Sequence, residues 1–337
     1  MKNCMRSLFL AGLVLFLALP AFAKGGAEAD SGKPIKLVGA TQLTYDNIFY
    51  RTIEKFKNEV LKDYKKPIQI DLFHSGAVGN EKDFFEFMIQ GVSVDFAESA
   101  PSWAATFSQK VSFLDPPFLY RDTDHWNKVC ALRTPFKPIE DELLKKGLRI
   151  LGYGGGGTRN LILRKPMTSL ADAKNIKLRT MASPLQTKLF GAAGFMVQTL
   201  DFLEVYNAAK TGVVDGLENE SAMLQSMKFY EVAPYIIMTQ HAITVRPLWM
   251  SEKTYQRLPK DLQEIVLKAG DAATKFHRES EVKEDAAALK EMESKGQIKI
   301  VQFPDKVKMQ ELVQPVLNDY AKELGVEDVM KAIAAVK

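Results

Sequence analysis

The stretch Ile-Lys-Leu-Arg at 176–179 carries the residues with the clearest potential for chemistry. Its apolar residues alternate with Lys177 and Arg179, the two-residue period of a half-buried strand, so both cations share the polar face. Arg179 ends this strand, and Ser183 with Pro184 then has the pattern of a helix N-terminus. Ligands of open α/β sheets bind beyond the carboxyl ends of strands, and helix N-termini favour anions. Arg179 is therefore either a solvated strand residue or a guanidinium placed to hold an anion.

Sequence motifs of catalysis and metal binding are missing. The sequence has no Gly-x-Ser-x-Gly elbow, no phosphate-binding glycine loop, and no His-x-x-x-His or Cys-x-x-Cys spacing. Glu81, Asp83 and Glu86 share one expected helix and have the pattern of a solvated face. The residues thus argue against an enzyme, and we expect no metal and no other cofactor. The histidines are His74, His125, His241 and His277.

The N-terminus has the composition of a secretory signal. Lys2 and Arg6 precede the apolar run 8–19, and Ala21-Phe22-Ala23 follows as a cleavage site. The run is too short to cross a membrane comfortably, which disfavours the alternative of an uncleaved anchor. We therefore expect a signal peptide over 1–23, a periplasmic mature protein, and a disordered glycine-rich tether over 24–33.

Charge and cysteine content narrow the class of protein further. Cleavage after residue 23 removes two cations and no acid, so the formal net charge falls from +4 to +2. A nearly neutral chain without a basic stripe is a poor nucleic-acid binder. Cys130 then remains as the one cysteine, so the fold must be held by its core, and the length suits two domains.

The order of predicted elements indicates an α/β protein. Strands and helices alternate at the start of the chain, which predicts a sheet with helices on its faces. The four glycines at 154–157 are expected to end one strand, either at a crossover or hinge between domains or at an ordinary glycine turn. From residue 270 the pattern is helical, with one late strand at 298–303. The first elements are expected at 35–42 (strand), 46–64 (helix), 68–74 (strand), 81–91 (helix) and 94–101 (strand and loop).

Five stretches, in order along the chain, resemble the solute-binding proteins of TRAP (tripartite ATP-independent periplasmic) transporters, the DctP-like family. Each stretch alone is a weak match, but their order and spacing make the resemblance specific, and it covers essentially the whole mature chain. The stretches are GTRNLILRKP (157–166), IKLRTMASP (176–184), EVYNAAKTGVVDGLEN (204–219), KFYEVAPYIIMTQH (228–241) and LPKDLQEIVLKAG (258–270).

The resemblance implies a two-domain α/β fold of the periplasmic-binding-protein type, with crossing strands and a long C-terminal helix spanning both domains. Domain I is then expected at 34–156 plus about 245–284, and domain II at 157–244 plus about 285–312. A C-terminal helical segment at about 313–337 is expected to lie across both. The domains close on a ligand held in the cleft between them.

The resemblance also implies the binding residues. Arg179 corresponds to the arginine that bridges a substrate carboxylate, Arg159 to a second arginine, and Asn219 to the asparagine that ends the Asp-Gly-x-Glu-Asn motif. Phe202 corresponds to an aromatic residue that packs on the ligand. Glu98 resembles a carboxylate that binds ligand hydroxyls, with a register uncertain by about two residues.

The nature of the ligand stays open at this stage. Relatives that bind sialic acid carry a further arginine soon after the glutamate, where this chain has Pro101 and Trp103. The resemblance implies a small organic acid as ligand, the small and large membrane subunits of a TRAP permease as partners, and a monomer. A longer, more apolar acid is the alternative within the family. A secreted α/β enzyme and a structural or adhesive protein are alternatives from other classes.

Overall fold

The computed structural model describes residues 34–337. The expected signal peptide at 1–23 and tether at 24–33 lie outside the described residues. The strands are β1 (Ile35–Ala40), β2 (Ile68–Phe73), β3 (Phe96–Glu98), β4 (Leu148–Leu163), β5 (Lys177–Thr180), β6 (Met196–Thr199), β7 (Gly216–Glu220), β8 (Tyr235–Ser251) and β9 (Lys299–Val301).

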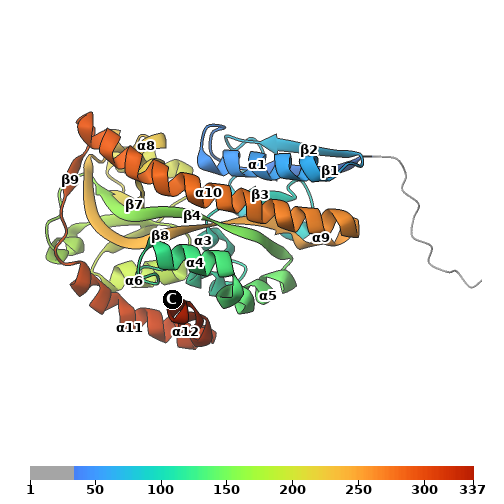
Figure 1. The fold of residues 1–337 in the computed structure, drawn as a ribbon. Helices are drawn as coiled ribbons and strands as arrows, with labels where there is room; N and C mark the ends of the chain where they lie inside the picture. The colour runs from blue at the N-terminus through green and yellow to red at the C-terminus, as the bar shows by residue number, and fades with distance from the viewer. Residues whose placement is uncertain (1–33) are drawn as a thin grey trace, which may run out of the picture.

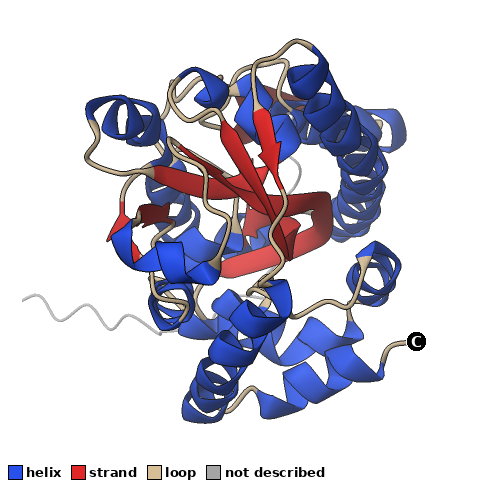
Figure 2. Ribbon diagram, turned by 90° about the vertical axis from the view of Figure 1, so that its left-hand side faces the viewer, coloured by secondary structure: helices blue, strands red, loops and turns tan. Residues whose placement is uncertain are grey.

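Helices cover the faces of the sheet, as the alternating pattern predicts (Figure 2). The α-helices are α1 (Ile48–Asp63), α2 (Glu81–Gln90), α3 (Pro101–Ala104), α4 (Thr123–Leu132), α5 (Lys137–Lys145), α6 (Pro184–Ala192), α7 (Val205–Thr211), α8 (Ser221–Ser226), α9 (Glu252–Arg257), α10 (Lys260–Ser294), α11 (Lys306–Leu324) and α12 (Glu327–Ala335). The 3-10 helices are η1 (Gln109–Phe113), η2 (Thr134–Phe136), η3 (Leu170–Asn175), η4 (Phe202–Glu204) and η5 (Phe229–Glu231). Between residues 34 and 337, no helix combines the length and the apolar character needed to span a membrane.

The sheet consists of two parallel groups joined by two long antiparallel strands. Its order is β2-β1-β3-β8-β4-β7-β5-β6, with β9 beside β8. β1 is parallel to β2 and β3, and β5 is parallel to β6 and β7, whereas β4 and β8 run antiparallel to each other. We call the half built on β1, β2 and β3 the first lobe, and the half built on β5, β6 and β7 the second lobe. At about 3.3 Å per residue, the 16 residues of β4 extend about 53 Å, enough to cross both lobes.

The glycine run does not end a strand, which corrects the prediction for 154–157. β4 continues through all four glycines, and its pairing with β8 slips between Gly155 and Thr158. Gly155 and Gly156 have φ of 105° and 125°, which side-chain-bearing residues rarely adopt, so the strand bulges here without stopping. The amide groups freed by the bulge donate to the side chains of Thr244 and Glu281. The crossing segment between the lobes is therefore continuous strand.

One helix lies along both lobes. α10 has 35 residues, about 52 Å at 1.5 Å per residue, and it runs beside β4 from one lobe to the other (Figure 1). It packs on α1 of the first lobe, on β4 and on α8 of the second lobe. On the opposite side of the sheet, α11 packs on α6 and η1, and α12 packs on η2.

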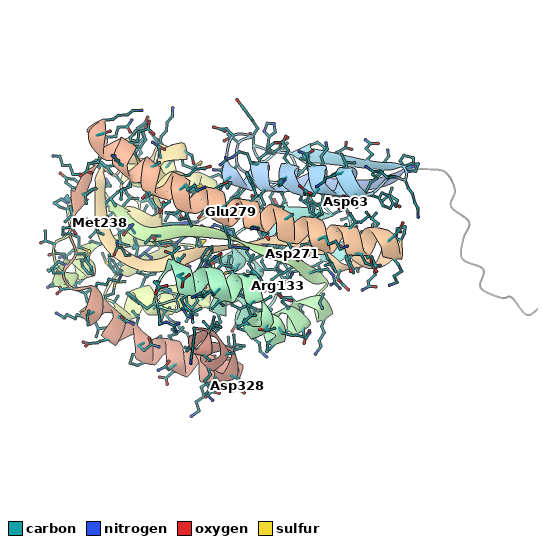
Figure 3. All side chains as sticks on the ribbon, in the orientation of Figure 1. Asp63, Arg133, Met238, Asp271, Glu279 and Asp328 are labelled. Atoms are coloured by element: carbon teal, nitrogen blue, oxygen red, sulfur yellow. The ribbon has the colours of Figure 1, made fainter. Side chains whose placement is uncertain are left out.

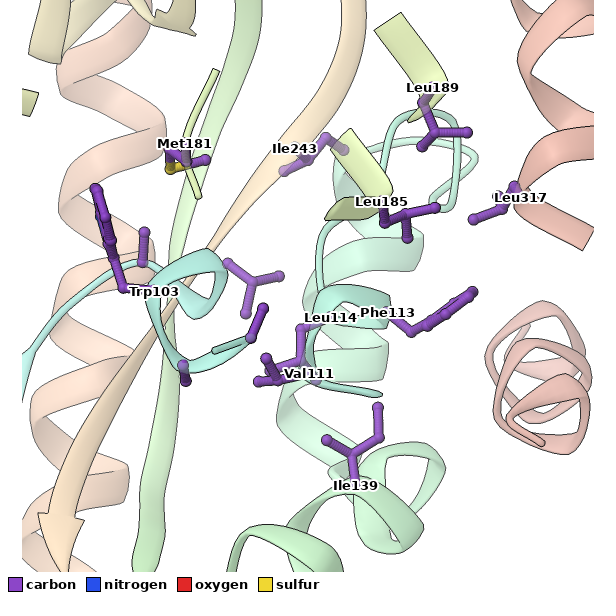
Figure 4. Packing of buried hydrophobic residues seen from close by; sticks show 14 of the residues in the cluster. Trp103, Val111, Phe113, Leu114, Ile139, Met181, Leu185, Leu189, Ile243 and Leu317 are labelled. Atoms are coloured by element: carbon purple, nitrogen blue, oxygen red, sulfur yellow. The ribbon is translucent and has the colours of Figure 1, made fainter. Parts of the chain in front are cut away.

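The largest hydrophobic core binds these elements together. Leu185 and Leu189 of α6 meet Leu317 of α11 beside Phe113 (Figure 4). This core runs through segments that the sequence assigned to both domains, so the exact domain boundaries stay a prediction. Charged side chains such as Asp271 and Glu279 on α10 lie on the outside of the fold (Figure 3).

Candidate functional site

A cavity lies between the lobes, where β4 and β8 cross from one to the other. Its volume is about 30 Å³, so the two lobes enclose it closely. The first lobe contributes residues from the loop after β1, from α1, from α2 and from the segment before and within α3. The second lobe contributes residues from the ends of β5 and β7, from η4 and from α8. The lining residues are Gln42, Leu43, Phe49, Glu81, Ala100, Trp103, Arg159, Arg179, Met181, Phe202, Asn219, Met223 and Arg246.

Arg179 lies in this cavity with its charge uncompensated. Its strand ends at Thr180, and Ser183 caps α6 with Pro184 at the first helical position, as the sequence predicts. The side chain is 2% exposed, and Nε and Nη2 donate to the backbone oxygen of Leu200 at 3.0 and 2.7 Å. No acidic side chain of residues 34–337 lies within 4 Å of the guanidinium. Burial without such a partner lowers the pKa of Arg179 to about 10.

Arg159 lies in the same cavity, but its charge is matched by acids of the chain. Its Nε and Nη2 form a fork onto the carboxylate of Glu218, with Nη2 2.7 Å from Oε1, and Nη1 lies 3.3 Å from Glu220 Oε2. Burial alone would raise the pKa of Glu218, but Arg159 and His241 outweigh burial and hold it at about 2. The antiparallel register of β4 and β7 sets Arg159 opposite Glu220, which explains the pairing. Arg159 is therefore engaged before any ligand arrives.

Asn219 of β7 and Arg246 of β8 form another part of the wall, on the two strands that flank β4. Arg246 Nη2 lies 3.5 Å from Asn219 Oδ1 and 3.1 Å from Glu220 Oε2, and Nη1 lies 3.9 Å from Asp115 Oδ2. Burial, partly offset by Arg246, raises the pKa of Asp115 to about 6. Arg246 Nε is buried and has no hydrogen-bond partner in the described chain. The sequence interpretation missed Arg246, because nothing in its local pattern marks it.

Aromatic and apolar side chains complete the walls. Phe202 lies with its ring centroid 5.6 Å from the Arg179 guanidinium carbon, close enough for a cation–π contact. Phe49 of the first lobe belongs to the same buried cluster as Phe202 and Met223 of the second lobe. Trp103 contributes a further aromatic wall. A ligand here would contact aromatic rings as well as charged and amide groups from both lobes.

Glu98, which the resemblance proposed as a ligand contact, does not line the cavity. It is fully buried at the end of β3, and its Oε1 lies 2.7 Å from Nδ1 of His277 on α10. The carboxylate in the cavity is that of Glu81, which the helical pattern indicated as solvated. Glu81 is 6% exposed, and it is the first residue of α2, where its carboxylate accepts from Ser99 Oγ and the backbone nitrogen of Ala100.

The geometry brings Arg159, Arg179, Phe202 and Asn219 together and leaves Glu98 outside the lining, against His277. Across residues 34–337, no cluster of three or more His, Cys, Asp or Glu side chains is arranged to hold a metal ion. The chemistry available is recognition of an anion and of hydroxyl groups. Two α/β lobes joined by continuous strands around such a cavity define a two-lobed solute-binding protein.

Comparison with known proteins places the chain more narrowly. The sequence model of the bacterial extracellular solute-binding proteins, family 7 (DctP), matches residues 39–323. A solute-binding protein of Sulfitobacter sp. (strain NAS-14.1) is 43% identical over 300 residues, which cover 89% of this chain and 91% of the relative. The chain therefore belongs to this family, the DctP-like solute-binding proteins of TRAP transporters.

Solved structures agree on the fold. A TRAP periplasmic solute-binding protein from Sulfitobacter sp. NAS-14.1, with bound α-D-taluronate, superposes with a TM-score of 0.86 at 42% identity, covering 89% of this chain and 97% of that one. The sugar acid binding protein of Advenella mimigardefordensis strain DPN7T, in complex with galactonate, has a TM-score of 0.84 at 26% identity, covering 90% and 99%.

Proposed function

We propose that this chain captures a sugar acid of the hexuronate or hexonate class in the cavity between its lobes. It then delivers the acid from the periplasm to the small and large membrane subunits of a TRAP permease. The observation that carries the proposal is Arg179, a buried cation with no acidic partner in the described chain. An isolated buried charge is costly, and a ligand carboxylate would remove that cost.

The guanidinium suits a carboxylate better than an ammonium group would. Its planar fork presents paired donors, and Arg179 Nη1 forms no hydrogen bond with any residue of 34–337. Enclosure between the lobes keeps water away, which strengthens the attraction between the two charges. A carboxylate is therefore the group we expect against Arg179.

The remaining lining supports a ligand that also carries hydroxyls. Asn219, Gln42, Glu81 and Arg246 offer donors and acceptors around the cavity, and Phe202 offers a ring face. A sugar acid combines one carboxylate, several hydroxyls and apolar ring faces. The relatives point the same way, because solved structures similar to this chain hold α-D-taluronate, β-D-galacturonate and galactonate.

Isothermal titration calorimetry with galacturonate, its methyl ester and galactose tests this function. The ester keeps every ring hydroxyl and loses only the charge. We expect galacturonate to bind and the ester to bind at least 30-fold more weakly, since leaving one member of a buried charge pair unmatched costs about 2–5 kcal/mol. Equal affinity for acid and ester would contradict recognition through the carboxylate.

Two further measurements test the longer apolar acid and the enzyme, two of the alternatives that the sequence left open. Mass spectrometry of ligand released by denaturing the purified protein distinguishes a sugar acid from a longer, apolar acid. Incubation of the protein with galacturonate and analysis of the solution distinguishes binding from turnover. Recovery of unchanged galacturonate supports a binding protein, and appearance of a product would indicate an enzyme.

A further inference from the structure

The cavity carries opposite charges on its two sides. Arg179 projects from the second lobe, and Glu81 projects from α2 of the first lobe. We infer that the cavity admits an acid with a single carboxylate, and that Glu81 binds a hydroxyl at the other end of the ligand and excludes a second carboxylate there. This inference rests on the proposed function and specifies its substrate class.

The charges around the cavity leave room for one anionic group. Arg159 is matched by Glu218 and Glu220, and Arg246 lies 3.1 Å from Glu220. Arg179 is the lining arginine without an acid within 4 Å among residues 34–337. One ligand carboxylate would compensate it. A second carboxylate would find every other lining guanidinium already facing an acid, and would remain desolvated without a partner.

Glu81 is held as an acceptor by its surroundings. Its Oε1 accepts from Ser99 Oγ at 2.7 Å and from the backbone nitrogen of Ala100 at 3.2 Å, and its Oε2 accepts from Gln42 Nε2 at 2.7 Å. Its place at the start of α2 adds the positive end of the helix dipole. Burial raises the pKa of Glu81. The three hydrogen-bond donors and the positive end of the helix dipole oppose this effect, because each of them stabilises the ionised carboxylate.

The neighbouring amide makes this end of the cavity rich in acceptors. Gln42 Oε1 is buried and has no hydrogen-bond partner in the described chain, while its Nε2 is engaged with Glu81. A hydroxyl can donate to Gln42 Oε1 or to the remaining lone pair of Glu81 Oε2. A carboxylate has no hydrogen to donate and would be repelled by Glu81. The two acceptors therefore select a neutral, hydroxylated end.

Galactonate and galactarate form a matched pair for the test, because they differ only at C6, where a hydroxymethyl group is replaced by a carboxylate. Calorimetry with the wild-type protein at pH 7.5 should give a Kd for galactarate at least 30-fold above that for galactonate. Glu81→Gln keeps the size of the side chain and an oxygen for Ser99 and Ala100, and its amide can donate to a carboxylate. This variant should lower the ratio of the galactarate Kd to the galactonate Kd at least fivefold, mainly because it binds galactarate more tightly.

Glu98→Gln is the control, since Glu98 is also a buried carboxylate of the first lobe but faces His277 outside the lining. It should leave the ratio within twofold of wild type. Equal binding of both acids by the wild-type protein overturns the inference without any variant. A folded Glu81→Gln protein with an unchanged ratio overturns it as well. If the wild-type protein binds no sugar acid, the proposed function fails and the inference fails with it. If it binds both equally, only the inference fails.

Discussion

Two buried clusters of charged side chains lie close together in this protein and differ in how they are compensated. The hinge cluster consists of Glu98, His277 and Glu281, beside the bulge where β4 crosses between the lobes. His277 Nδ1 lies 2.7 Å from Glu98 Oε1, and His277 Nε2 lies 2.5 Å from Glu281 Oε2. Glu281 Oε1 also accepts from the backbone nitrogen of Gly157 at 2.9 Å and from Thr244 at 2.6 Å.

The cavity cluster consists of Gln42, Glu81, Arg179 and Arg246, and it leaves several polar atoms without partners in the described chain. These include Gln42 Oε1, Arg246 Nε and the Nη1 group of Arg179. The residues of the cavity cluster come from both lobes. The hinge cluster lies on α10 and at the end of β3.

The difference shows how structural and ligand-binding charges can be told apart. Both clusters are buried, so burial alone does not separate them. The hinge cluster matches its charges within the chain, because His277 lies between Glu98 and Glu281, although Glu98 Oε2 has no hydrogen-bond partner in the described chain. This matching of charges suits a part that holds the crossing strands in place. The cavity cluster needs donors and acceptors from outside, which suits a binding site. The following predictions test this distinction.

Loss of Arg159 should give the largest effect, and the effect should be on stability. Arg159→Ala leaves Glu218 and Glu220 buried with one cation fewer, and breaking a buried pair in this way costs about 3–5 kcal/mol of folding free energy. Urea denaturation of the unliganded protein measures this loss. A change below about 1 kcal/mol would mean that Arg159 is not held by its two acids.

Loss of Arg179 should affect binding far more than folding. Arg179→Ala should weaken sugar-acid binding by about 30-fold to several-thousand-fold, the equivalent of about 2–5 kcal/mol. Arg179→Lys should lose at least tenfold, because the bidentate fork is lost. The folding free energy should change by no more than about 1 kcal/mol, since the lost hydrogen bonds to Leu200 and the removed cost of an unpaired buried cation oppose each other.

Lys177→Ala is the matched control on the same strand face. Lys177 Nζ donates to the backbone oxygen of Gly212 at 2.7 Å, away from the cavity, so affinity should change less than threefold. Calorimetry on Arg179→Ala, Arg179→Lys and Lys177→Ala measures the three affinities. Binding by Arg179→Ala within threefold of wild type would show that the cavity does not recognise its ligand through Arg179.

The hinge cluster should make folding stability depend on pH. Burial lowers the pKa of His277, but Glu98 and Glu281 outweigh burial and raise it to about 9, against about 6.5 in an unfolded chain. Because the folded state holds this proton more tightly, the contribution of His277 is complete below pH 6.5 and is lost as pH rises through about 9. The unfolding free energy should therefore fall between pH 7 and 9.5, and His277→Gln should flatten that fall. An equal slope in both proteins would rule out a protonated His277.

The smallest effect should come from Glu98 on binding. Glu98→Gln keeps the shape of the side chain and lies outside the lining, so sugar-acid affinity should change less than threefold. Calorimetry on this variant distinguishes a hinge residue from a ligand contact. A loss of affinity of tenfold or more would show that Glu98 takes part in ligand binding. The two clusters would then not differ in function.

Local patterns in the sequence were sufficient for much of the architecture. The alternation at 176–179 predicted β5, and Ser183 with Pro184 predicted the start of α6. Gly212 ends α7 in the left-handed conformation, which glycine adopts readily. These features depend on residues within a few positions of each other, so their signals survive without knowledge of the fold. The motif resemblance then placed Arg159, Arg179, Phe202 and Asn219 at one site, and the structure brings all four to one cavity.

Other features were decided only by contacts between distant segments. The glycines at 154–157 continue as strand because Thr244 and Glu281, 87 and 124 residues from Gly157, accept its backbone hydrogen. Glu81 enters the cavity and Glu98 meets His277 because of how α2 packs on α3 and β8 and how α10 packs on β4 and α1, which no local spacing encodes. Whether an arginine is free for a ligand likewise depends on the acid that the sheet register sets beside it. The sequence determined which charges the chain carries, and the tertiary structure decided which of them were left without partners, because compensation of a buried charge acts over a few ångströms of space whatever the separation along the chain.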